Sequence, residues 1–214
     1  RRNAPAYVAD YRKLEWPIAW HSDLREHAAG HGLKYGCSVY LAKDVAKIAA
    51  FADYIKVSSF EVGDDALLTA ALRTGRRVIV STGMCADYKD ILPTLDRGMP
   101  WAVLHCCSSY PAPLSGLNLR SIKRGLRPAL NGFSDHSRDV RAGAWAVAAG
   151  AEVIETHFRL LDCDPTNKDY AVSFTPAELA EYVRNIRDCE TALGDGVKRV
   201  MDAENEMLKF KVKS

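Results

Sequence analysis

The sequence predicts an α/β protein that forms an incomplete (β/α)₈ TIM barrel, with six βα units in this chain. Two observations lead to this fold class. Continuous apolar runs of strand length, typical of parallel strands covered on both faces, alternate with segments of helical periodicity. Nearly every run also ends in hydroxyl or charged residues, as strands do where a parallel α/β fold carries a site. The remaining two barrel strands are expected before residue 1, and a smaller open sheet is the alternative.

The first part of the chain supplies three strands and three helices. The expected order is helix 23–29, strand 33–40, helix 42–52, strand 54–59, helix 64–73 and strand 77–81. The second of these helices places Val45, Ile48 and Ala52 on one face. The third is stopped by Gly75, a residue that commonly follows a helix C-terminus.

The second part continues the alternation. The expected order is helix 87–96 despite Pro93, strand 101–106, a weak helix at 117–124, a strand ending at His136, helix 140–149, a strand ending at His157 and helix 176–193. Residues 140–149 are small and apolar and close at Gly150, which suits a crossover helix with a glycine cap. The last helix has the clearest start signal, because Thr175 and Glu178 can form a capping box around Pro176.

The composition describes a soluble globular protein with a substantial core. The chain of 214 residues has a net charge of +2, and 48% of its residues are hydrophobic. This charge gives no reason to expect nucleic acid or an anionic membrane as a partner, and no apolar run is long enough to span a bilayer. The six cysteines have neither disulfide-scaffold density nor metal spacing, so reduced thiols in a cytoplasmic protein are expected.

The polar residues at the strand ends predict a small-molecule site. They are Ser38; Lys56, Ser59 and Glu61; Ser81 and Thr82; Ser108, Ser109 and Tyr110; Ser134, Asp135 and His136; and Glu155 and His157. Inside a parallel barrel these side chains would converge on one mouth. A lysine among several hydroxyls suits a phosphate or carboxylate ligand, because the ammonium supplies charge and the hydroxyls supply short donors.

Two of the strand ends carry a histidine. The helix between them makes the two strands parallel, so His136 and His157 are expected at the same edge of the sheet. Two imidazoles there could hold a divalent metal ion, with nearby carboxylates orienting them. The alternative is a pair of histidines that only form hydrogen bonds at strand ends.

Five motifs, in this order, resemble those of the sialic acid synthases, the group that includes N-acetylneuraminate, legionaminate and pseudaminate synthases. They are Lys56-Val57-Ser58-Ser59-Phe60-Glu61, Ser81-Thr82-Gly83-Met84, His105-Cys106-Cys107-Ser108-Ser109-Tyr110-Pro111, Ser134-Asp135-His136 and Glu155-Thr156-His157-Phe158. The likeness runs from about Leu14 to Leu208.

The resemblance implies an enzyme that condenses phosphoenolpyruvate with an open-chain N-acylated hexosamine aldehyde, such as N-acetylmannosamine, to give a nonulosonic acid and phosphate. It implies that His136 and His157 hold a manganese or magnesium ion as catalytic groups, and that the catalytic Glu61 lies near the reacting atoms. The substrate contacts of the family fall on Ser38, Lys56, Ser59, Ser81, Ser108, Tyr110, Ser134 and Asp169. Tyr110 and Asp169 would face the sugar.

The chain also departs from the family pattern. It has no counterpart of the family's first two strands, which carry a glutamate and a lysine of the site, or of the C-terminal antifreeze-like domain. In the homodimers of the family, that domain lends an arginine to the partner subunit. We therefore expect a partial barrel domain at 1–196 and a tail, or the start of a linker, at 197–214.

Two other functions fit the same strand-end residues. A different barrel aldolase or lyase would use Lys56 as a Schiff-base nucleophile. A non-catalytic relative would keep the mouth of the barrel only to bind a sugar acid.

Overall fold

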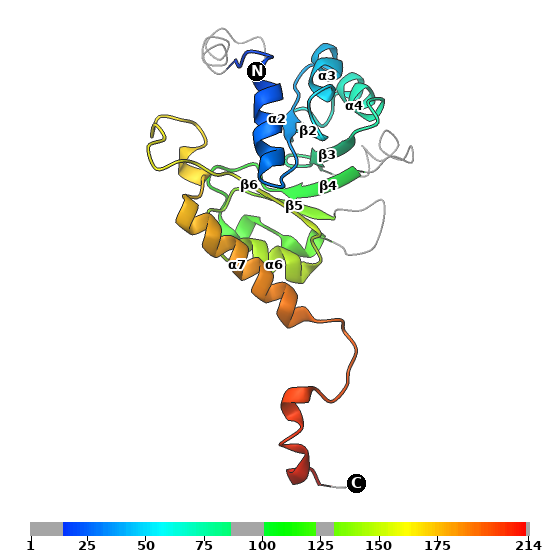
Figure 1. The fold of residues 1–214 in the computed structure, drawn as a ribbon, viewed down its shortest axis with the longest axis vertical. Helices are drawn as coiled ribbons and strands as arrows, with labels where there is room; N and C mark the ends of the chain where they lie inside the picture. Colours follow the sequence, from blue (N-terminus) through cyan, green and yellow to red (C-terminus); the bar gives the residue numbers. More distant parts are fainter. Residues whose placement is uncertain (1–14, 87–100, 123–130, 213–214) are drawn as a thin grey trace.

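The strands of the protein form one curled parallel sheet. A computed structural model describes residues 15–86, 101–122 and 131–212. Its six strands run in the order β1-β2-β3-β4-β5-β6, and every neighbouring pair is parallel. The sheet curves into part of a barrel with the helices on its outside (Figure 1). The predicted fold class, an incomplete TIM barrel, is confirmed.

The elements have the following bounds. The strands are β1 (Gly36–Ser38), β2 (Tyr54–Val57), β3 (Arg77–Ser81), β4 (Trp101–Cys106), β5 (Gly132–Asp135) and β6 (Val153–Thr156). The α-helices are α2 (Trp20–Gly30), α3 (Ala42–Ala49), α4 (Asp65–Leu72), α6 (Ala142–Ala149) and α7 (Pro176–Leu193). The short 3₁₀ helices are η2 (Leu114–Gly116), η3 (Leu119–Ser121), η4 (Tyr170–Val172), η5 (Asp202–Glu204) and η6 (Leu208–Phe210).

Three expectations need comment. The strand expected at 33–40 pairs only over β1, and Tyr35 N donates to Asp53 Oδ2 at 2.9 Å instead of joining the ladder. The prediction of a weak helix at 117–124 is wrong for the described residues of that range, which form 3₁₀ turns. Asn118 adopts a left-handed conformation with φ 42°, which interrupts an α-helix. The helix expected at 87–96 lies outside the described residues.

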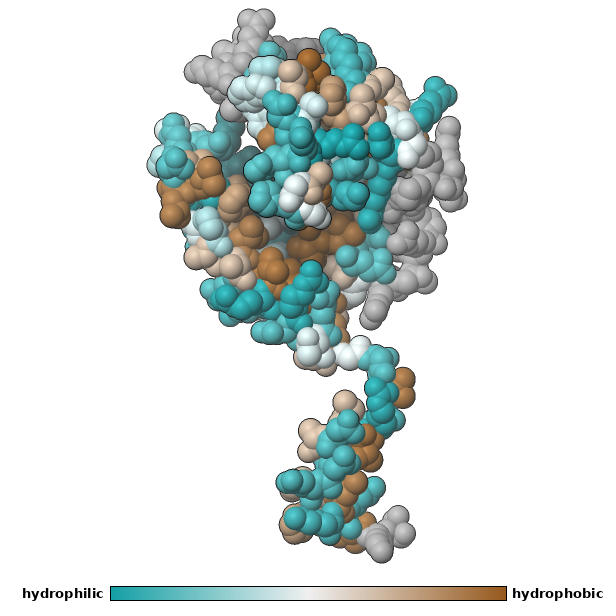
Figure 2. Space-filling model, viewed as in Figure 1, coloured by the Kyte–Doolittle hydropathy of each residue, from teal (hydrophilic) through white to brown (hydrophobic). Residues whose placement is uncertain are grey.

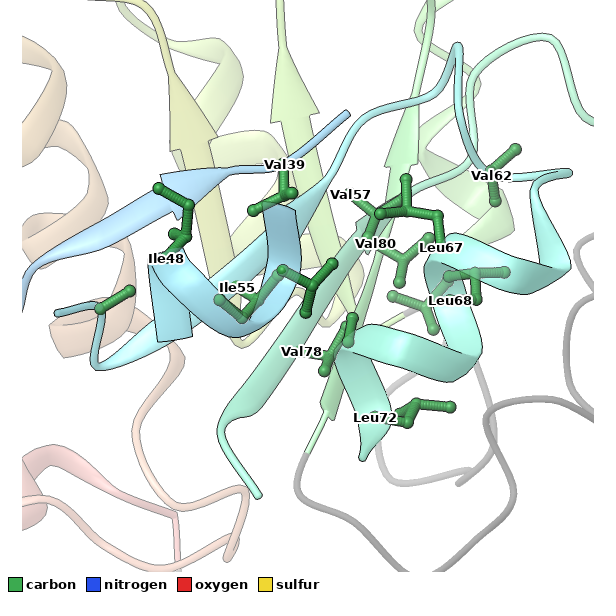
Figure 3. Packing of buried hydrophobic residues seen from close by; sticks show 14 residues of the cluster. Val39, Ile48, Ile55, Val57, Val62, Leu67, Leu68, Leu72, Val78 and Val80 are labelled. Atoms are coloured by element: carbon green, nitrogen blue, oxygen red, sulfur yellow. The ribbon is translucent and has the colours of Figure 1, made fainter. Parts of the chain in front are cut away.

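The outer face of the sheet forms the larger hydrophobic cluster. Side chains alternate between the two faces of a strand, so Ile55, Val57, Val78 and Val80 all point the same way. They are fully buried against apolar residues of α3 and α4, among them Leu67 (Figure 3). Each such side chain contributes about 1.5–3 kcal/mol when it is buried. The opposite face of the same strands is therefore the one left for the polar strand-end residues.

The second cluster packs α6 and residues 112–122 against β5, and α7 packs against α6. Phe133 of β5 is buried against Ala142 and Ala146 of α6. A Cβ at Gly143 would lie 2.5 Å from Cζ of Tyr182 on α7, so the contact between these helices requires glycine. The predicted capping box at the start of α7 is present, and the glycine that caps α6 has a positive φ of 112°. Both helix boundaries were thus readable from the sequence.

Residues 195–212 follow α7 as a tail that extends away from the barrel portion (Figure 1). The tail exposes apolar side chains between polar ones (Figure 2), among them Val197, Met207 and Phe210. The division of the chain at residue 197 stays a prediction.

All six cysteines are free thiols, as expected. In the part of the chain that the structure describes, no helix is long and apolar enough to cross a membrane.

Candidate functional site

Glu155 is the group around which the polar strand-end side chains gather. One oxygen of its carboxylate accepts hydrogen bonds from Ser134 Oγ at 2.6 Å and from Ser81 Oγ at 3.2 Å. The other oxygen lies 3.4 Å from Lys56 Nζ. The predicted convergence of Lys56, Ser81 and Ser134, which come from three different strands, is therefore present. The sequence predicts Glu155 as a polar strand-end residue, but its central position depends on the strand register.

The ammonium of Lys56 is buried inside this cluster. The residue is only 7% exposed, and Nζ donates to Val57 O at 3.2 Å in addition to pairing with Glu155. A buried charge requires such partners, because removing an ion from water without them is costly. An ammonium has three donors, so Lys56 can offer a further one to an anionic ligand.

A second group of hydroxyls surrounds Gly83, just beyond β3. The backbone N of Gly83 donates to Ser59 Oγ at 2.9 Å. A Cβ at Gly83 would lie 2.1 Å from Ser108 Oγ, so glycine lets both serines approach the backbone. Backbone amides beside small hydroxyls make a concavity that suits phosphate oxygens. Ser38 lies at the exposed end of β1 as the register partner of Lys56.

The two predicted histidines lie side by side. The centroids of His136 and His157 are 5.1 Å apart. Nδ1 of His136 lies 3.2 Å from Cys107 O, and Nδ1 of His157 lies 3.8 Å from Asp169 Oδ2. Because Nδ1 of each ring has a partner, Nε2 is the nitrogen available to a ligand. The ring of Tyr110 stands next to both, with its centroid 4.4 Å from that of His136 and 6.2 Å from that of His157.

This pair suits a divalent metal ion with an open coordination sphere. Two imidazoles oriented through Nδ1 are the arrangement that metal-ligating histidines require. Among the described residues, no group of three or more histidine, cysteine or acidic side chains could hold an ion. An ion bound by His136 and His157 would therefore take its other ligands from water and substrate. The metal itself stays a prediction.

The pKa shifts in the mouth follow from burial and from close contacts. Burial lowers the pKa of His157 and outweighs the charge of Asp169, which favours the neutral imidazole that binds metals. Burial by itself would lower the pKa of His136 and raise that of Cys106. The contact between the two side chains, with Nδ1 and Sγ 3.7 Å apart, outweighs burial. The pKa of His136 is therefore raised and that of Cys106 is lowered. Cys106, expected only as a core thiol, thus lies against a site residue.

Two carboxylates near the mouth have other partners. Glu61 is buried in the turn after β2, where it accepts a hydrogen bond from Ser58 Oγ. This bond fixes Glu61 locally and does not involve the histidine pair. Asp135 accepts from Tyr182 OH at 2.9 Å and from Ser137 N at 2.8 Å. Asp135 therefore ties the end of β5, which carries the neighbouring site residues, to α7.

The fold and the site together define a class of protein. It is an α/β barrel protein in which charged, hydroxyl and imidazole groups meet at the carboxyl ends of parallel strands. A sequence profile of the NeuB family matches residues 1–198. The chain belongs to the NeuB family. The match starts upstream of Leu14, where the motif resemblance began.

Relatives of known sequence agree with this membership. An uncharacterized protein of Methanocaldococcus jannaschii, MJ1065, is 38% identical over 94% of this chain and 62% of its own length. Pseudaminic acid synthase of Campylobacter jejuni is 31% identical over 94% of this chain and 60% of its length. Human N-acetylneuraminate-9-phosphate synthase is 32% identical over 92% of this chain and 57% of its length. The chain thus spans less than two thirds of these curated relatives.

Solved structures show the same relationship. The crystal structure of an N-acetylneuraminic acid (sialic acid) synthetase from Leptospira borgpetersenii, in complex with citrate, superposes with a TM-score of 0.81 at 27% identity. The match covers 92% of this chain and 70% of that one. A truncated 3-deoxy-D-arabino-heptulosonate 7-phosphate synthase from Thermotoga maritima has a TM-score of 0.63 at 18% identity, which is a likeness of fold.

Proposed function

We propose that the protein to which this chain belongs condenses phosphoenolpyruvate with an open-chain N-acylated hexosamine, such as N-acetylmannosamine, to give a nonulosonic acid and phosphate. One observation carries the proposal. A buried lysine and two serines gather around Glu155 in the same mouth that holds the paired His136 and His157. Membership of the NeuB family supports it, because relatives are named as synthases of pseudaminic acid and of N-acetylneuraminate 9-phosphate.

Phosphoenolpyruvate carries a phosphate and a carboxylate, and the mouth has donors for both. Lys56 provides the charge, and the proposed hydroxyl contacts are Ser59, Ser81, Ser108 and Ser134, with Ser38 at the rim. The carboxylate of Glu155 already accepts from three of these donors. An incoming anion must therefore share them with Glu155, which holds the donors in position before the substrate arrives.

The sugar would bind on the side of the histidine pair. C3 of phosphoenolpyruvate attacks the aldehyde carbon, water adds at C2, and the C2–O bond breaks to release phosphate. A divalent manganese or magnesium ion held by His136 and His157 would act as a Lewis acid on the aldehyde oxygen. Tyr110 and Asp169 flank these rings and would orient the sugar hydroxyls. Glu61 is proposed as the carboxylate close to the reacting atoms.

The assembly is also a proposal. We infer that the whole protein acts as a homodimer in the cytoplasm, on two small molecules and without nucleic acid or membrane partners. The near-balanced net charge of this chain, +2, supports the absence of polyanionic partners.

The test uses the natural full-length protein with phosphoenolpyruvate, N-acetylmannosamine and Mn²⁺. We expect equal amounts of phosphate and of nonulosonic acid, measured by a phosphate assay and by mass spectrometry. Lys56→Met should lose this activity, whereas Lys47→Met, at an exposed lysine of α3, should keep it. Borohydride trapping of substrate on Lys56 would favour the aldolase alternative. Binding of a sugar acid without release of phosphate would favour the non-catalytic one.

A further inference from the structure

A pocket opens beside His157, one of the two paired histidines. It has a volume of about 410 Å³ and is lined by His157, Arg159, Leu160, Asp162, Asp169 and Tyr170, with others from the same loop. His157 and Asp169 belong to the proposed sugar side of the mouth. The pocket is therefore continuous with the place where the acceptor sugar would bind. The proposed function leaves Arg159 without a role.

Arg159 has one buried N–H group without an acceptor. Its guanidinium Cζ lies 4.0 Å from the ring centroid of Tyr170, and its Nε is buried without a hydrogen-bond partner. Stacking on an aromatic ring holds the guanidinium plane but satisfies none of its N–H groups. A guanidinium has only donors, so its missing partner must supply oxygen acceptors. Buried donors without partners are rare, and a ligand is one explanation for them.

The backbone places this donor at a definite distance from the histidines. Phe174 N donates to His157 O, and Arg159 N donates to Phe174 O, both at 2.9 Å, so residues 157–159 are extended. Alternate residues of an extended segment share a side, and they lie about 6.5 Å apart. His157 and Arg159 thus line one side of the pocket. An acceptor sugar with its aldehyde carbon at His157 would have its far end near Arg159.

The other charges of the pocket do not neutralise Arg159. Asp169 lies near His157, and Asp162 is exposed to solvent, where its field is screened. Neither carboxylate forms an ion pair with Arg159. These two side chains can accept from sugar hydroxyls, whereas Arg159 can only donate. The pocket therefore offers acceptors for hydroxyls and one cation for an anionic group.

We propose that Arg159 forms an anion subsite for the end of the acceptor sugar away from the aldehyde. The acceptor would then carry a phosphate ester or a carboxylate at that end. The identity of the acceptor rests on the proposed function, but the subsite can be measured by binding alone. A guanidinium matches the two oxygens of either group in a bidentate geometry.

The experiment measures binding to the natural full-length protein by titration calorimetry. The probes are N-acetylmannosamine, its 6-phosphate and its 6-carboxylate. The anionic probes should bind at least tenfold more tightly than the neutral sugar, and the tighter of the two identifies the group. Arg159→Met should weaken the anionic probes by about 10- to 100-fold, as expected for a charge-assisted hydrogen bond, and leave the neutral sugar within threefold. Arg187→Met, at an exposed arginine of α7, is the matched control.

Several results would overturn the subsite. Wild-type protein could bind the three probes equally or bind none of them, or Arg159→Met could weaken all three alike, as a purely structural arginine would. The proposed function is judged separately, by product formation. Arg159-dependent binding of an anionic probe without condensation would refute the function and keep the subsite. Condensation of the neutral sugar, with anionic probes that bind no more tightly than the neutral sugar, would keep the function and refute the subsite.

Discussion

Replacing Tyr182 by phenylalanine tests the hydrogen bond that joins α7 to Asp135 at the end of β5. Tyr182 and Asp135 are each 1% exposed, and the phenol OH donates to Oδ2 at 2.9 Å. Burial, together with the charge of Asp135, raises the pKa of Tyr182, so the phenol remains a donor throughout the neutral range. Phenylalanine keeps the ring contact with Phe174, whose centroid lies 4.9 Å away, and removes only the hydroxyl. The lost hydrogen bond to a buried charged group should cost about 1.5–3 kcal/mol of unfolding free energy.

The assay is urea unfolding of the natural protein, Tyr182→Phe, Asp135→Asn and the double variant. Because the two side chains contact each other, the double-mutant cycle should give a coupling energy of about 1 kcal/mol or more. Val183→Ala, at the exposed neighbouring position of α7, should stay within about 0.5 kcal/mol of wild type. A coupling energy within about 0.5 kcal/mol of zero would show that this bond does not hold the strand end.

Four further predictions concern the mouth and the cap of α7. His136→Ala and His157→Ala should each abolish tight Mn²⁺ binding, measured by calorimetry, because the paired imidazoles are the only protein ligands proposed. Lys56→Ala should weaken phosphoenolpyruvate binding by about 1.5–3 kcal/mol, the value for a charge-assisted hydrogen bond. Gly83→Ala should weaken it as well, since the added Cβ would lie 2.1 Å from a serine oxygen. The backbone N–H of Thr175 holds the pKa of Glu178 below its usual value. The free energy of unfolding should therefore decrease as the pH is lowered below about 4.3, and Glu178→Gln should reduce that decrease.

Each of these predictions has a defined contrary result. Unchanged Mn²⁺ affinity in both histidine variants would place the ion elsewhere. Equal affinity of wild type and Lys56→Ala for phosphoenolpyruvate would remove the lysine from that site. If Gly83→Ala bound normally, the serines beside it would have room to shift. If Glu178→Gln leaves the loss of stability at acid pH unchanged, other carboxylates cause the pH dependence.

Several features of the protein follow from local sequence alone. The apolar run Arg77–Ser81 became β3 with the expected bounds, because a strand buried on both faces needs little beyond continuous hydrophobicity. The capping box at Thr175 and the glycine cap at Gly150 formed as expected, because their partners lie within a few residues. The expected helix at 117–124 failed at its described residues, since Asn118 took a left-handed conformation that propensity does not encode.

The tertiary structure decided what the site residues contact. Lys56, Ser81 and Ser134 could be expected at one mouth, but their common partner Glu155 depends on strand register and on the curvature of the sheet. The partners Tyr182 and Asp135 lie 47 positions apart, so no local pattern joins them. Short-range periodicity and capping determine where helices and strands begin and end. Long-range packing determines which polar atoms meet, because that depends on how every intervening element is placed.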